Sequence, residues 1–72
     1  MPDTVTISIS LNGESRAVSW GETIAGLVRS LGLDPERLAI ELDHRIVKRP
    51  EWPATVLTEG AQLEIVQFVG GG

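Results

Sequence analysis

The chain has 72 residues, no Cys, a single His and a formal net charge of −4 at pH 7. A chain of this length forms one small domain. Without Cys it cannot form a disulfide, and His44 alone cannot form a structural zinc site. Ten acidic residues against six basic ones also argue against nucleic acid as a ligand, because nonspecific nucleic-acid affinity depends on positive charge.

The first predicted element is a β-hairpin. Apolar and polar residues alternate strictly over residues 5–11, which is the pattern of a strand with one buried face. Asn12-Gly13 is a preferred pair for a two-residue turn, so the chain is expected to return through residues 14–18. In that register Arg16 lies opposite the apolar Ile9, which requires either an edge position for its side chain or a bulge.

An amphipathic helix is predicted next. Thr23 is a suitable N-cap, and the apolar residues after it follow the spacing of one helical stripe. The residues of this stripe are Ile24, Leu27, Val28 and Leu31. Gly32 is suited to end the helix, and Asp34-Pro35 then has the residues of a second, short helical start.

Three further strands complete the predicted fold. They are expected at residues 38–42, at residues 46–47 after a turn over residues 43–45, and from residue 62 to about residue 68. A single helical turn is expected at residues 50–52. If the last strand lies beside the first, this order gives an α+β fold of the β-grasp type, in which a mixed sheet of about five strands is covered on one face by one main helix.

Glycines occupy the last three positions, Gly70, Gly71 and Gly72. At a background usage of about 7%, three successive glycines occur at a given place with a frequency of roughly 0.03%. We expect residues 1–69 to form one domain and residues 70–72 a flexible tail that can thread a narrow cleft. The Gly72 carboxylate, ionised at pH 7, would be an unhindered nucleophile for an activated phosphate. The competing interpretation is a frayed end without function.

The chain shows no catalytic apparatus of its own. It has no Walker-type glycine loop, no Cys nucleophile and no Ser-His-Asp set that the sequence places together. We therefore expect that the protein is not an enzyme and that its domain carries the glycine tail as a substrate for other enzymes. The longest apolar stretch, residues 24–28, is far too short to span a membrane, and Asp3, Asn12 and Glu14 occupy the region where a signal peptide would be apolar. A cytoplasmic location without a membrane partner follows as an expectation.

Several segments resemble one known family. They are Asn12-Gly13, the helix start Gly21-Glu22-Thr23, residues 46–52 and residues 64–72. Together they are similar to the ubiquitin-like sulfur carriers, and most closely to the ThiS type of thiamine biosynthesis. The Arg49-Pro50-Glu51-Trp52 segment is the most discriminating part. Two departures lie in turns: Asp43-His44 stands where the family often has Asn-Gly, and Ala61 stands where Asp is usual.

The resemblance implies a β-grasp carrier that binds no cofactor itself and is monomeric when free. A ThiF-type adenylyltransferase, which would bind ATP and Mg²⁺, would join the Gly72 carboxylate to AMP. Sulfur that originates with a cysteine desulfurase would then convert Gly72 to a thiocarboxylate (1-thioglycine), and thiazole synthase would accept this sulfur. The alternatives are a molybdopterin-synthase small subunit, another sulfur carrier, a ubiquitin-like modifier joined to lysines, or a plain interaction module.

Alternation along the last strand directs Val66 and Phe68 to the solvent, next to Val69 and the tail. Such an apolar patch would suit a partner that grips the domain, whereas a bulge would turn Phe68 back into the core. Four basic residues form either a solvated loop or a surface that steers an acidic partner. They are Arg37, Arg45, Lys48 and Arg49.

The two tryptophans and the single histidine have structural interpretations. We expect Trp20 and Trp52 to be packing anchors at the ends of short elements, because a buried indole contributes a large apolar area. We expect His44 to be an exposed turn residue, since no second ligand or nucleophile is near it in the sequence.

Overall fold

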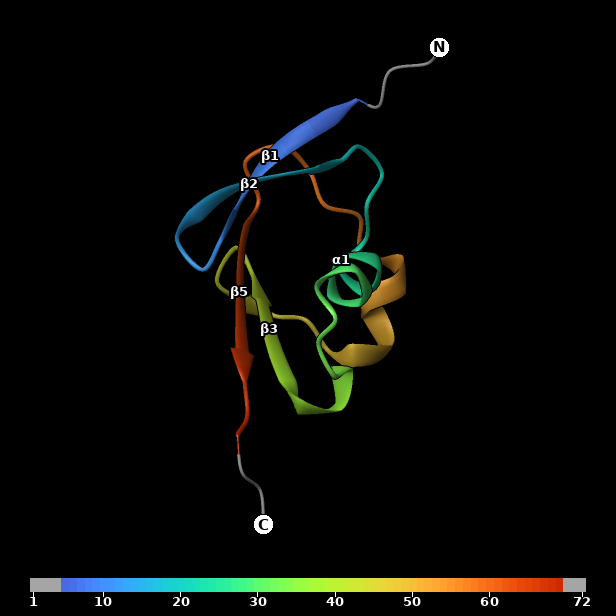
Figure 1. Ribbon diagram of the computed structural model, residues 1–72, viewed down its shortest axis with the longest axis vertical. Coiled ribbons are helices and arrows are strands. Elements are labelled where there is room, and N and C mark those ends of the chain that lie inside the picture. Colours follow the sequence, from blue (N-terminus) through green and yellow to red (C-terminus); the bar gives the residue numbers. More distant parts are fainter. Residues whose placement is uncertain (1–4, 70–72) are drawn as a thin grey trace.

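The computed structural model describes residues 5–69. These residues form a mixed five-stranded sheet with one main helix on one face (Figure 1). The elements are β1 (Thr6–Leu11), β2 (Glu14–Ser19), α1 (Ile24–Leu31), η1 (Pro35–Arg37), β3 (Leu38–Leu42), β4 (Arg45–Ile46), η2 (Arg49–Ala54) and β5 (Gln62–Gln67). The strand order is β2-β1-β5-β3-β4, with β1 and β5 parallel. The last strand therefore lies beside the first, and the β-grasp prediction is confirmed.

The β1–β2 hairpin has the strict two-residue register. Asn12 has a φ of 51° and Gly13 a φ of 86°, as a primed turn requires, and Arg16 pairs with Ile9. Pairing is continuous from Thr6↔Ser19 to Leu11↔Glu14, so β2 contains no bulge. Arg16 is exposed on this edge strand, which settles the alternative left open by the sequence.

Local signals set both ends of α1. The Thr23 hydroxyl accepts a hydrogen bond of 3.0 Å from the Gly26 N–H, which satisfies one of the free donors of the first turn. At the other end Gly32 has a φ of 72° and donates its N–H to the Arg29 carbonyl at 3.1 Å. Both predicted helix limits are confirmed.

The β3–β4 turn differs from the prediction by one residue. Asp43 and His44 both have positive φ, 51° and 70°, so they form a two-residue turn without glycine, and β4 begins at Arg45. The predicted turn over 43–45 was therefore one residue too long, and the strand predicted at 46–47 was one residue late. Asp43 is held in this conformation because its N–H donates to the Gln62 carbonyl at 2.7 Å and its carboxylate accepts the Gln62 N–H at 2.9 Å. His44 is exposed, as expected.

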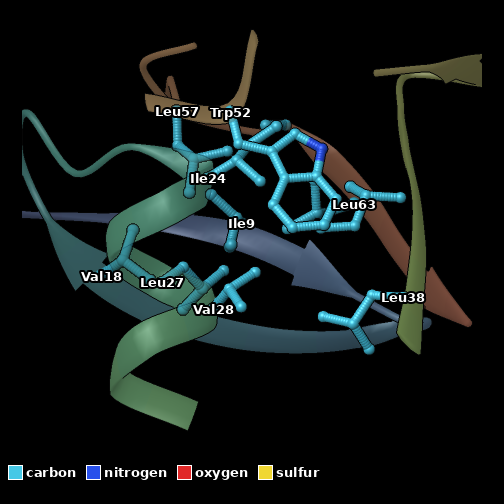
Figure 2. Close-up of a cluster of buried hydrophobic side chains, with 11 residues drawn as sticks. Ile9, Val18, Ile24, Leu27, Val28, Leu38, Trp52, Leu57 and Leu63 are labelled. Atoms are coloured by element: carbon cyan, nitrogen blue, oxygen red, sulfur yellow. The ribbon is translucent and has the colours of Figure 1, made fainter. Parts of the chain in front are cut away.

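The hydrophobic core lies between the sheet and the layer formed by α1 and η2 (Figure 2). Its largest fully buried side chains come from four different elements and are each 2% exposed or less: Ile9, Ile24, Leu27, Ile40 and Leu63. The expected single turn at residues 50–52 is the longer η2, whose Trp52 ring packs into this core. The Trp52 Nε1–H donates to the Val47 carbonyl at 2.8 Å, so its polar atom is satisfied.

Trp20 is not a packing anchor, and the prediction for it was wrong. Its side chain is 74% exposed, against 3% for Trp52. Trp20 lies one residue beyond β2, where the chain turns at Gly21 with a φ of 88°. The Trp20 N–H still donates to the carbonyl of Val5, the residue before β1, at 2.8 Å, but the ring faces the solvent.

Candidate functional site

The strand that leads into the glycines is central in the sheet. β5 lies between β1 and β3, with β1 parallel and β3 antiparallel to it. Its pairing with β1 is limited to Gln62 and Leu63, whereas its pairing with β3 continues to Gln67. The last part of β5 therefore has a strand neighbour on one side only. This part leaves the fold at the end of the molecule opposite the N-terminal end of β1 (Figure 1).

Asn12 takes the place of the missing neighbour at one position. The Asn12 backbone N–H donates to the Leu63 carbonyl at 2.9 Å, as in a parallel ladder. Its side chain then continues that ladder, because Oδ1 accepts the Ile65 N–H at 2.8 Å and Nδ2 donates to the Ile65 carbonyl at 3.2 Å. The amide of one side chain thus replaces a peptide group of β1 and fixes β5 two residues beyond the last β1 pair.

Arg37 fixes the last described part of the chain before the glycines. Its carbonyl accepts the Phe68 N–H at 2.7 Å, one residue past the end of β5. The Arg37 side chain in turn lies 3.6 Å from the Asp34 carboxylate, and both side chains are half exposed. The short helix η1 therefore holds the root of the tail, while Gly70, Gly71 and Gly72 lie outside the described residues.

The three apolar residues that the sequence singles out at this root are all exposed. Val66 is 55% exposed, Phe68 56% and Val69 91%. Val66 pairs with Ala39, between the buried Leu38 and Ile40, and so lies on the face of the sheet that α1 does not cover. No bulge returns Phe68 to the core. Their role in docking a partner stays a prediction.

The four basic residues lie on different elements. Arg37 lies at the tail root and has the one ion pair within residues 5–69, whereas Arg45 pairs with Leu42 at the β3–β4 turn. Lys48 and Arg49 are exposed at the start of η2 and line a shared hollow.

Sequence reasoning missed two parts of the site, the Asn12 side-chain bonds and the Arg37 carbonyl. The positive-φ turn indicates Asn at position 12 but does not indicate what its amide contacts. The Arg37 contact is a backbone contact and has no signature in residue type.

Within residues 5–69 no group of three or more His, Asp or Glu side chains could hold a metal ion. In the same part of the chain, no helix has the length and apolar character needed to cross a membrane.

The sheet order, the single covering helix and the central last strand define a β-grasp protein of the ubiquitin-like class. A protein computationally designed on the template of human erythrocytic ubiquitin has this fold, with a TM-score of 0.54 at 22% identity over 93% of this chain and 95% of the design. The ThiS family model matches residues 9–72, and the chain belongs to the ThiS family.

The crystal structure of the thiamine biosynthesis protein ThiS from Geobacter metallireducens is similar over 92% of this chain and 100% of that one, with a TM-score of 0.79 and 25% identity. A thiazole synthase from Magnetococcus marinus is 42% identical over 66 residues, which are 92% of this chain and 20% of that protein. A thiazole synthase from Paramagnetospirillum magneticum is 35% identical over the same shares of both chains. The chain thus spans about a fifth of the length of these two relatives.

Proposed function

We propose that this protein is a sulfur carrier of thiamine biosynthesis whose Gly72 carboxylate is the group that is activated, loaded and unloaded. The observation that carries this proposal is the match to the ThiS family over residues 9–72, which includes β5 and the three glycines that follow it. The chain is then a protein co-substrate, and the catalytic groups belong to its partners.

The proposed cycle begins with an adenylyltransferase of the ThiF type. A Gly72 carboxylate oxygen attacks the α-phosphorus of ATP in the partner's Mg²⁺-containing site, and pyrophosphate leaves. A cysteine desulfurase supplies the sulfur as a persulfide, and a thiol reduces it to the oxidation level of sulfide and is itself oxidised to a disulfide. This sulfur then attacks the acyl carbon, and AMP leaves. The product is a thiocarboxylate, which at neutral pH is a better nucleophile than the carboxylate.

The described residues support the handling of such a tail. Asn12 and the Arg37 carbonyl fix β5 up to Phe68, so the glycines begin two residues beyond a held point. Glycines carry no Cβ and can enter a cleft that excludes other residues. We propose that Gly70, Gly71 and Gly72 thread the partner's active site while Val66, Phe68 and Val69 contact its surface.

Thiazole synthase is the proposed acceptor of the sulfur. The support is that two relatives named thiazole synthase contain a segment similar to this chain within a longer polypeptide. In those proteins the similar segment and the remainder are covalently joined, which is consistent with a functional association between a domain of this type and thiazole synthase.

The first step can be tested alone with the purified adenylyltransferase of the same organism. Exchange of labelled pyrophosphate into ATP should depend on this chain and should be lost when residues 71–72 are removed. The control is Glu14→Gln, which changes an exposed side chain of β2 and should leave the exchange intact. Exchange that persists without residues 71–72 would contradict the proposal.

A further inference from the structure

A groove of about 500 Å³ lies in the helical layer, between α1 and η2. It is on the other side of the sheet from Val66, and the proposed carrier cycle makes no use of it. Figure 1 shows the two elements that bound it side by side, next to the short helix η1.

The floor of the groove is apolar and held in place. Val28 and Trp52 are each 3% exposed, and the indole N–H is already bonded to the Val47 carbonyl. Every lining residue other than Arg29 and Arg49 is apolar or glycine. The apolar lining is formed by Ala25, Val28, Leu33, Pro35, Trp52 and Pro53.

The two arginines give this apolar groove a positive rim. Arg29 and Arg49 are exposed, and the one ion pair of residues 5–69 is that between Arg37 and Asp34. Arg29 lies in the last turn of α1, where the helix dipole favours a cation. Arg49 begins η2, where the helix dipole does not favour a cation. Although the chain has a net charge of −4, the rim of this groove is positive and would attract negatively charged groups.

This combination fits a protein segment better than a small molecule. Small-molecule sites usually carry several directional polar groups that fix the ligand, and this lining offers only the two guanidinium groups. Apolar walls with charges at the rim are instead typical of grooves that receive one face of a peptide.

The groove is also close to the root of the tail. Pro35, which lines it, is the first residue of η1, and Arg37 at the end of η1 holds the Phe68 N–H. A segment bound between α1 and η2 would lie within one short helix of the point where the tail leaves the fold.

We propose that the groove docks a partner segment in which carboxylates flank an apolar side chain. The apolar side chain packs on Val28 and Trp52, and the carboxylates pair with Arg29 and Arg49. A protein bound to the face that carries Val66 leaves this groove free, so two partners can hold the domain at once. The groove itself requires no tail, so this proposal is independent of the sulfur-carrier proposal.

The test is an NMR titration of the full ¹⁵N-labelled chain with two synthetic peptides. One has two glutamates on each side of a Leu-Phe pair, and the other has lysines in place of the glutamates. The acidic peptide should produce saturable shifts at Arg29, Leu33 and the Trp52 indole N–H, and these should weaken with added salt. The lysine peptide should bind at least about tenfold more weakly.

Variants locate the binding. Arg29→Glu combined with Arg49→Glu should raise the Kd for the acidic peptide at least about tenfold, because attraction becomes repulsion at both rim positions. Arg16→Glu is the control, since Arg16 is also exposed, on β2, but does not line the groove, and it should leave the Kd within about twofold. Truncation after Val69 should have no effect on peptide binding.

Equal binding of the two peptides, or shifts spread over the sheet face, would overturn the proposal. The same groove shifts with acetate at an equal carboxylate concentration would assign the groove to a small anion and would also overturn it. If the acidic peptide does not bind but Gly72 is still loaded with sulfur, only the groove proposal fails. If the peptide binds but Gly72 is not loaded, only the carrier proposal fails.

Discussion

The side-chain amide of Asn12 and the backbone of Ile65 exchange two hydrogen bonds, of 2.8 Å and 3.2 Å, across a sequence separation of 53 residues. The first hairpin turn is thereby joined to the strand that leads into Gly70–Gly72. The same residue has the positive φ of 51° that the turn requires. Asn12 thus serves both the hairpin and the placement of the last strand.

The two roles of Asn12 can be separated by substitution. Asn12→Gly keeps the positive φ at no steric cost but removes both side-chain bonds, and should lower the free energy of unfolding by about 1–2 kcal/mol. Asn12→Ala should lower it further, because alanine is strained at this φ. Urea unfolding measures both, and hydrogen exchange should show reduced protection of the Ile65 amide. If the Ile65 amide in Asn12→Gly were as protected as in the wild type, the Asn12 side chain would not be what holds β5 at Ile65.

Val66 tests the face proposed to meet the adenylyltransferase. Val66→Asp should raise the KM of adenylation by at least about tenfold, because the new carboxylate would be buried against an apolar partner surface without a hydrogen-bonding partner. The unfolding midpoint should hardly change, since the side chain is 55% exposed. The matched control is Val5→Asp, the same change at a 65% exposed position directly before β1. Equal kinetics in wild type and Val66→Asp would remove Val66 from the docking surface.

The two tryptophans should report opposite environments. Trp20→Phe leaves Trp52 as the one fluorophore and should give blue-shifted emission with stability within about 0.5 kcal/mol of wild type. Trp52→Phe leaves the 74% exposed Trp20 and should give red-shifted emission. It should also cost about 1–3 kcal/mol, because the part-buried Val47 carbonyl loses the indole donor. Similar emission maxima in the two variants would contradict the fold around Trp52.

Thr23 tests the start of α1. Thr23→Ala should destabilise the protein by about 1 kcal/mol, since the Gly26 N–H loses its acceptor, and Thr23→Ser should retain most of the stability. Thermal unfolding followed by circular dichroism compares the three proteins. A Thr23→Ser variant as unstable as Thr23→Ala would show that the hydroxyl is not the stabilising group.

The features that sequence predicted well depend on neighbouring residues. The hairpin depends on Asn12-Gly13, and α1 on the Thr23 cap, the apolar stripe and Gly32, all within a few residues of each other. The β3–β4 turn was predicted one residue too long because Asp43 and His44 both adopt positive φ. A pair without glycine does not indicate this conformation in the sequence. Contacts with Gln62, 19 residues away, hold it there.

The features that sequence could not predict depend on the packing of distant segments. Alternation places Trp20 on the core side, but its ring is 74% exposed in the folded chain. The bonds of Asn12 to Ile65 and of Arg37 to Phe68 exist because β5 inserts between β1 and β3. The candidate site was therefore located from the glycines, while the contacts that hold its root required the fold.

The sulfur-carrier function is tested by the intact mass of the chain after incubation with its adenylyltransferase, ATP, Mg²⁺, a cysteine desulfurase, cysteine and dithiothreitol as the thiol reductant. The chain should gain the mass difference between sulfur and oxygen, located by fragmentation at Gly72 and absent without ATP. A chain that keeps its mass under these conditions, or that forms only larger adducts with lysines of other proteins, would contradict the sulfur-carrier function.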